Sequence, residues 1–146
     1  MPKIDPNNFI GSSPDEFKEQ YRDAKEEVPY NMPEPRGRFV VVTAFVDAAH
    51  ASDKRTRRSH TGYVIFINRA PILFYSKRQS TVESSTFSSE FIALKTCTES
   101  IIALRFKLRM FGVPINGPAL VLNDNQSTVN NSSKIESIFN KKHKSI

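Results

Sequence analysis

The sequence predicts an α/β domain with a mixed sheet, and three observations support this class. Apolar runs rich in β-branched and aromatic residues occur at 38–49, 62–76 and 118–124, as expected for strands. Apolar residues recur at helical intervals through 82–111. The helix therefore stands between two strands, which predicts a right-handed parallel crossover. The run at 62–76 is long enough for two strands, which predicts an antiparallel hairpin.

The domain begins near residue 38, and residues 1–37 are interpreted as a linker or appendage. Six of the nine prolines lie in this first segment, and its apolar residues are too sparse for a core. A short helix is expected there over 13–27, where Glu and Lys alternate. The first domain strand, 38–49, is an almost continuous apolar run, which predicts a central strand buried on both faces.

Turn and capping residues separate the later elements. Asn68, which tolerates positive φ, is expected to turn the hairpin. Ser80 and Glu83 have the spacing of a capping box and predict the start of the long helix, which Gly112 and Pro114 end. A short helix is expected after the strand that ends at Asp124. A further amphipathic helix, interrupted by the end of the chain, is expected over 134–146.

Charge and composition favour some functions over others. The chain has 146 residues and a formal net charge of +6, and its bases cluster at 54–58, 76–78, 105–109 and 141–144. Such clusters favour an anionic partner, nucleic acid first, although a solvated basic face is an equal alternative. The single cysteine, Cys97, can form neither an internal disulfide nor a zinc site, and its place in the helix predicts a small buried side chain.

The sequence also carries expectations about location. No apolar stretch reaches the roughly 18 residues that a membrane helix needs, so no membrane partner is expected. Residues 1–17 lack the apolar region of a secretory signal. We therefore expect an intracellular protein, cytoplasmic or nuclear, that is not secreted.

Three acids stand where parallel strands and a helix could bring them together. Asp47 and Asp124 each end an apolar strand, and strand ends at the carboxyl edge of a parallel sheet commonly form sites. Glu83 and Glu90 lie about two turns apart on the helix and so on nearly one face. Glu90 stands in the apolar sequence SSEFIAL, where an unpaired charge is costly.

An oxygen-only set of ligands, without His or Cys, favours Mg²⁺ or Mn²⁺ over zinc. Two such ions about 3.5–4 Å apart can promote phosphodiester hydrolysis. The alternative is that Asp47 and Asp124 are polar strand ends and that Glu90 pairs with a lysine or arginine. A Ser/His/Asp triad and a glycine-rich phosphate loop are both disfavoured, because the three histidines have no nucleophile motif nearby and only five glycines are present.

The motifs NMPEPRG, FVDAAHASD with TRRSHTGY, FYSKRQSTVESSTFSSEFIAL, LRMFGVPI, NDNQSTV and KKHKSI follow one another between residues 31 and 146. In this order and spacing the chain resembles the ribonuclease H domain of Ty1/copia-type retrotransposon polyproteins. The resemblance implies a ribonuclease H-like mixed sheet of order 3-2-1-4-5 with helices packed on it. Here the order would be 3-2-1-4, because the sequence ends before the fifth strand.

The resemblance implies a function as well as a fold. The domain would hydrolyse the RNA strand of RNA–DNA hybrids with two Mg²⁺ or Mn²⁺ ions held by Asp47, Glu90 and Asp124. Its nucleic-acid contacts would include the bases that flank the first acid and end the hairpin: Arg57, Arg58, Lys77 and Arg78. Such contacts position a backbone without reading its sequence. The remainder of a polyprotein is expected as a further partner.

The chain also departs from the family pattern. Ala49 and Ser52 replace residues usual in the loop after the first acid, and the domain over 38–146 is expected to be truncated at its C-terminus, without the fourth metal-binding acid. Two functions therefore stay open. One is a ribonuclease H-type endonuclease. The other is a catalytically inactive, nucleic-acid-binding remnant of a retroelement.

Overall fold

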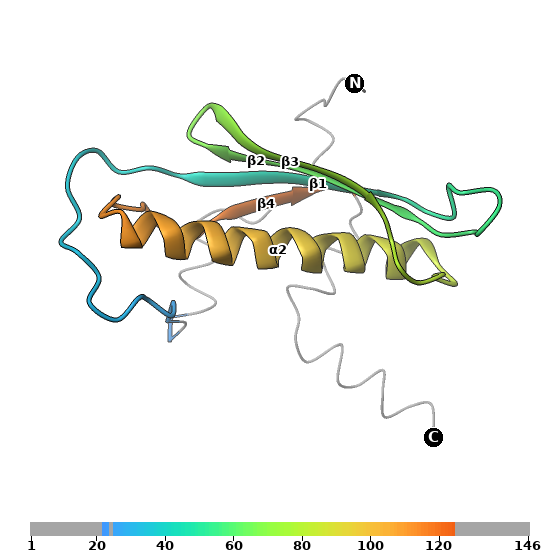
Figure 1. The fold of residues 1–146 in the computed structure, drawn as a ribbon, viewed down its shortest axis with the longest axis horizontal. Coiled ribbons are helices and arrows are strands. Elements are labelled where there is room, and N and C mark those ends of the chain that lie inside the picture. Colours follow the sequence, from blue (N-terminus) through green and yellow to red (C-terminus); the bar gives the residue numbers. More distant parts are fainter. Residues whose placement is uncertain (1–21, 24, 125–146) are drawn as a thin grey trace.

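Four strands form one mixed sheet, and a long helix packs along one of its faces (Figure 1). The computed structural model of the chain describes residues 22–23 and 25–124. The elements, in chain order, are β1 (Val42–Ala49), β2 (His60–Ile67), β3 (Ala70–Arg78), α2 (Thr86–Met110) and β4 (Leu120–Asn123). The sheet order is β3-β2-β1-β4, which confirms the predicted 3-2-1-4 order.

The pairing of the strands also agrees with the sequence. β1 pairs antiparallel with β2 and β2 antiparallel with β3, whereas β1 and β4 are parallel. The helix connects the two parallel strands, because a parallel pair needs a crossover connection. The predicted helices after Asp124 lie outside the described residues. Most of the helix predicted over 13–27 also lies outside them, and residues 25–27, which are described, are not helical.

The core lies between α2 and the face of the sheet that α2 covers. Alternate residues of β1 point inward, and small residues on the helix let it approach closely. The buried apolar residues are Val42, Ala44, Val46, Ala48, Tyr63, Ile65, Ala93, Cys97 and Ile101. Burial raises the pKa of the Cys97 thiol to about 12 and so keeps it neutral. This residue is the small buried side chain that the sequence predicted.

β1 is central, as predicted, but the prediction that it is buried on both faces is wrong. Thr43 and Phe45, on the face away from α2, are only half-buried, and Asp47 is exposed. The apolar run looks continuous because it includes Val40, which lies before the strand and forms an isolated bridge with Ile115. In the part of the chain that the structure describes, only one helix covers the sheet.

The hairpin turn and the two ends of the helix have clear local causes. Asn68 turns the hairpin with a φ of 54°, as predicted, and its Oδ1 accepts a hydrogen bond from the Val41 backbone N–H. The capping box predicted at Ser80 is wrong. Ser85 caps the helix instead, accepting from the Ser88 backbone N–H at 3.1 Å.

At the other end of the helix, Gly112 adopts a φ of 70°, and its N–H donates to the carbonyl of Arg109. A side chain at position 112 would meet the Glu34 carbonyl oxygen at 3.4 Å, so both conformation and space favour glycine. The predicted stop of the helix at this glycine is confirmed.

Ion pairs and a backbone hydrogen bond connect the segment before β1 to the C-terminal end of α2. Arg105 donates from Nε and from its terminal nitrogen to the two carboxylate oxygens of Glu26, each at 2.8 Å, and Arg109 also donates to Glu26. These two guanidinium groups hold the pKa of Glu26 at about 2. The backbone N–H of Arg36 adds a hydrogen bond to the Gly112 carbonyl.

Replacing Glu26 by glutamine is expected to lower the free energy of unfolding by about 1–2 kcal/mol, a value reduced for solvent screening. Because its pKa is depressed, the Glu26 carboxylate stabilises the fold above about pH 4.5, and this contribution disappears as the pH falls towards 2. Urea unfolding at pH 7 and pH 3 measures both effects. Glu27→Gln, at the neighbouring exposed position, is the matched control. Equal stability of the two variants at pH 7 would contradict the prediction.

No helix in residues 22–23 and 25–124 is long and apolar enough to cross a membrane.

Candidate metal centre

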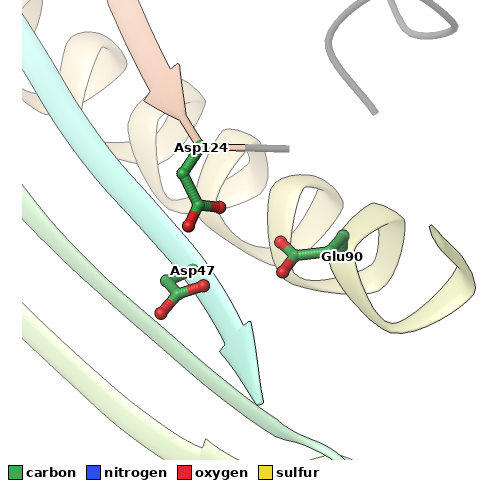
Figure 2. Close-up of side chains that lie close together, drawn as sticks. All are labelled: Asp47, Glu90 and Asp124. Atoms are coloured by element: carbon green, nitrogen blue, oxygen red, sulfur yellow. The ribbon is translucent and has the colours of Figure 1, made fainter. Parts of the chain in front are cut away.

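Two neighbouring strands and the start of the helix bring three carboxylates to one end of the sheet (Figure 2). β1 and β4 run parallel, and the last pair in their register is Val46 with Asn123. Asp47 and Asp124 follow these residues directly, so they stand at the same level along the two parallel strands. Glu90 comes from the first turns of α2, on the side that faces the two strands (Figure 2).

One oxygen from each of Asp47, Glu90 and Asp124 lies within 4.8 Å of the others. The convergence predicted from the sequence is therefore confirmed. Metal binding itself stays a prediction. Glu83 does not share the helix face with Glu90, because it lies before the Ser85 cap, where it accepts a hydrogen bond from the Thr81 hydroxyl. Within residues 22–23 and 25–124, Glu90 forms no ion pair with a lysine or arginine, and its side-chain hydrogen-bond partner is Asn123.

The electrostatics of the cluster disfavour three negative charges together. Glu90 is only 3% exposed, and burial, with repulsion from Asp47 and Asp124 as a smaller cause, raises its pKa to about 7. The pKa of Asp47 is also raised, by burial first and by Asp124 second. The backbone N–H of Ala48 partly offsets this by donating to Asp47 Oδ1 at 2.8 Å.

These observations test whether a divalent cation fits. The donor set consists of carboxylate oxygens only, which is the set that Mg²⁺ and Mn²⁺ prefer. Burial is the main cause of the raised pKa of Glu90 and of Asp47, and a cation among the three would offset the repulsion between carboxylates that adds to it. The residues present therefore fit a hard divalent cation.

Asn123 belongs to the centre and was missed from the sequence. Its side chain is fully buried, and its Nδ2 donates to Glu90 Oε2 at 3.1 Å and to the Val46 carbonyl oxygen at 3.3 Å. One signal could have found it. In a strand whose side chains alternate, position 123 points to the helix side, where a polar residue needs a partner.

The four predicted nucleic-acid contacts do not all lie together. Arg58, Lys77 and Arg78 line one open groove of about 690 Å³, whose other lining residues are Ser52, Asp53, His60, Gln79 and Ser80. Arg57 does not line this groove; it is exposed in the preceding loop with a φ of 57°. Arg78 is already paired with Asp53 at 2.6 Å, and this ion pair lowers the pKa of Asp53.

The groove lies beside the carboxylate cluster. Ala49, two residues beyond Asp47, is opposite His60, which is opposite Arg78. Of the groove residues, His60 therefore lies one strand spacing from Ala49 and Arg78 two, or roughly 5 and 10 Å. Gln79 joins the two regions, because its Nε2 donates to the carbonyl of Ser89, the residue before Glu90, at 2.9 Å.

Comparison with known proteins does not assign a family. No family model matches the chain, and no solved structure matches it. The chain is similar to a protein described as secreted RxLR effector protein 161 of Plasmopara viticola, with 30% identity over 80 residues. The match covers 55% of this chain and 56% of that protein, so the chain spans about half the length of this curated relative.

The similarity corrects one expectation. The chain was expected to be intracellular, cytoplasmic or nuclear, and not secreted, because residues 1–17 lack an apolar signal region. A relative that is itself described as secreted contradicts this prediction.

Proposed function

We propose that this chain is a ribonuclease H-type nuclease domain of the Ty1/copia retrotransposon class, acting on the RNA strand of RNA–DNA hybrids. The observation that carries the proposal is the convergence of Asp47, Glu90 and Asp124 within 4.8 Å. The sheet order β3-β2-β1-β4, with one helix between the parallel strands, supports it. So do the sequence motifs that surround each of the three acids.

The three carboxylates would hold two Mg²⁺ or Mn²⁺ ions, which supply the activation of a water molecule and the stabilisation of the leaving oxygen. The chain's own contribution differs from residue to residue. Glu90 is buried and accepts a hydrogen bond from Asn123, so its carboxylate would be a metal ligand that is fixed in position and shielded from water. Asp47 and Asp124 are exposed, so they stand on the side open to a substrate.

The basic groove would hold the phosphate backbone of the hybrid beside the cluster. Arg58 and Lys77 are its candidate contacts, since Arg78 is engaged by Asp53. Such contacts would fix the register of the hybrid over the carboxylates.

Cleavage of a hybrid with labelled RNA tests the proposal. The chain is incubated with Mg²⁺, with Mn²⁺ or with chelator, and single-stranded RNA and duplex DNA serve as control substrates. Metal-dependent cleavage of the RNA strand in the hybrid alone is expected. Binding of the hybrid without cleavage, by a chain shown to be folded, would favour an inactive nucleic-acid-binding remnant. Neither binding nor cleavage would contradict both functions.

Replacing Arg58 or Lys77 by alanine is expected to weaken hybrid binding about tenfold. Each lost phosphate contact should also reduce the slope of log affinity against log salt by about one. Fluorescence anisotropy over a salt series in chelator measures both quantities without cleavage. Arg69→Ala, in the exposed β2–β3 turn at the opposite end of the strands, is the matched control. An unchanged salt slope in both groove variants would exclude the groove as the binding surface.

A further inference from the structure

One buried amide connects all three elements that carry the carboxylates. Asn123 ends β4, directly before Asp124; its Nδ2 contacts Glu90 on α2, and the same Nδ2 contacts the Val46 carbonyl, directly before Asp47 on β1. We propose that Asn123 is a positioning residue that sets the spacing of the three carboxylates for a divalent cation. This inference rests on the proposed function, because it assumes that the cluster binds metal.

The chemistry at position 123 requires a donor with two hydrogens. Both neighbours of Nδ2, the Glu90 carboxylate and the Val46 carbonyl oxygen, are acceptors. A primary amide supplies two N–H groups from one nitrogen, which satisfies both acceptors at once. An aspartate at this position would place an acceptor against two acceptors, and a leucine would leave both without this partner.

The position itself would otherwise suit an apolar residue. Asn123 is 1% exposed, and Val121, on the same face of β4, packs against the core. Burying an amide is costly unless its hydrogen bonds are made. The hydrogen bonds to Glu90 and Val46 offset part of the cost of burying this amide.

The contact also extends the pairing of the two parallel strands. The register of β1 and β4 ends at Val46 with Asn123, and the side-chain amide adds a hydrogen bond across this last pair. Asp47 and Asp124 are the next residues along the two chains. Their separation is thus fixed by the same amide that holds Glu90 in place.

The test compares two variants of equal shape in the full chain. These variants are Asn123→Val and Asn123→Thr. Valine and threonine have nearly the same shape as each other, and neither opens a cavity in place of asparagine, but only threonine keeps a hydroxyl donor. Calorimetric titration with Mn²⁺ measures the dissociation constant of the cluster directly, and thermal unfolding in chelator reports the fold. The valine variant is expected to bind Mn²⁺ about 10–100-fold more weakly, as is typical of lost outer-shell partners. The threonine variant should recover part of this loss.

Val121→Ala, which removes volume from the same face of β4, is the matched control and should leave Mn²⁺ binding unchanged. Valine and threonine variants that bind Mn²⁺ as the unmodified chain does, or equally weakly, would overturn the positioning role. If the unmodified chain itself binds no Mn²⁺, it is the proposed function that fails.

A measurement on the unmodified chain covers the case in which the variants do not fold. The side-chain amide resonance of Asn123 should be protected from solvent exchange and should shift on titration with Mg²⁺, with the midpoint found by a calorimetric titration with Mg²⁺. A resonance that exchanges rapidly, or that does not move while Mg²⁺ binds, would equally overturn the inference.

Discussion

Asp47→Asn is expected to abolish metal-dependent cleavage of a hybrid while leaving the metal-free chain at least as stable as the unmodified chain. The substitution keeps the shape of the side chain and removes one of three charged ligands, so the loss of activity should exceed the roughly 100-fold of an outer-shell change. Stability should not fall, because burial and Asp124 already disfavour the Asp47 charge in the folded state. Cleavage assays and urea unfolding in chelator measure the two quantities.

This opposite response of activity and stability separates a functional site from a structural one. A structural carboxylate, such as Glu26 between its two arginines, stabilises the fold, and its loss should destabilise it. Glu83→Gln is the matched control for Asp47→Asn, since Glu83 is an acid outside the cluster and should affect neither cleavage nor stability strongly. An Asp47→Asn variant that still cleaves the hybrid would refute the assignment of the metal centre.

The three acids could be predicted from the sequence because each lies at a boundary that the pattern marks. Asp47 and Asp124 end apolar strands, and the helix between those strands forces them to be parallel and hence to end at the same edge. Glu90 stands out as a charge in an apolar helical stretch. The three residues meet because the parallel pairing of β1 with β4 and the packing of α2 bring them to one end of the sheet.

Features that depend on tertiary contacts could not be predicted in the same way. Ser80 and Ser85 both have a suitable side chain for a cap, and which of them begins the helix is decided by where the chain leaves β3 and meets the core. The directions of the basic side chains could not be predicted either. The loop that contains residues 54–58 is irregular, so the spacing of its residues does not indicate that Arg58 lines the groove and Arg57 does not.

Asn123 was missed for a related reason. Its importance lies in its two partners, which are 33 and 77 positions away in the sequence. Nothing in the stretch PALVLNDN distinguishes an asparagine that ends a strand from one that holds a distant carboxylate. Only the packing of α2 against β1 and β4 brings the partners within hydrogen-bonding distance.

The metal-free chain is expected to lose stability as the pH rises from below 4.5 to above 7, and Glu90→Gln should remove most of this loss. The folded-state pKa of Glu90 is raised from 4.5 to about 7, so the folded chain binds this proton more tightly than the unfolded chain does. Raising the pH through this interval removes a proton that stabilises the fold. At about 1.4 kcal/mol per pH unit, the expected loss is about 3 kcal/mol.

Urea unfolding in chelator at pH 5 and pH 8, for the unmodified chain and for Glu90→Gln, measures the pH dependence that Glu90 introduces, including its repulsion with Asp47 and Asp124. Glu26 and Asp53 do not interfere, since their pKa values are lowered and their effects fall at more acidic pH. Mg²⁺ at pH 8 should restore stability to the unmodified chain, because it binds the ionised cluster of the folded state only. The glutamine variant should respond to Mg²⁺ much less. If the two chains showed the same pH dependence, ionisation of the buried Glu90 carboxylate would not be what destabilises the metal-free fold. Neutralising that charge with a cation would then not be expected to restore stability at pH 8.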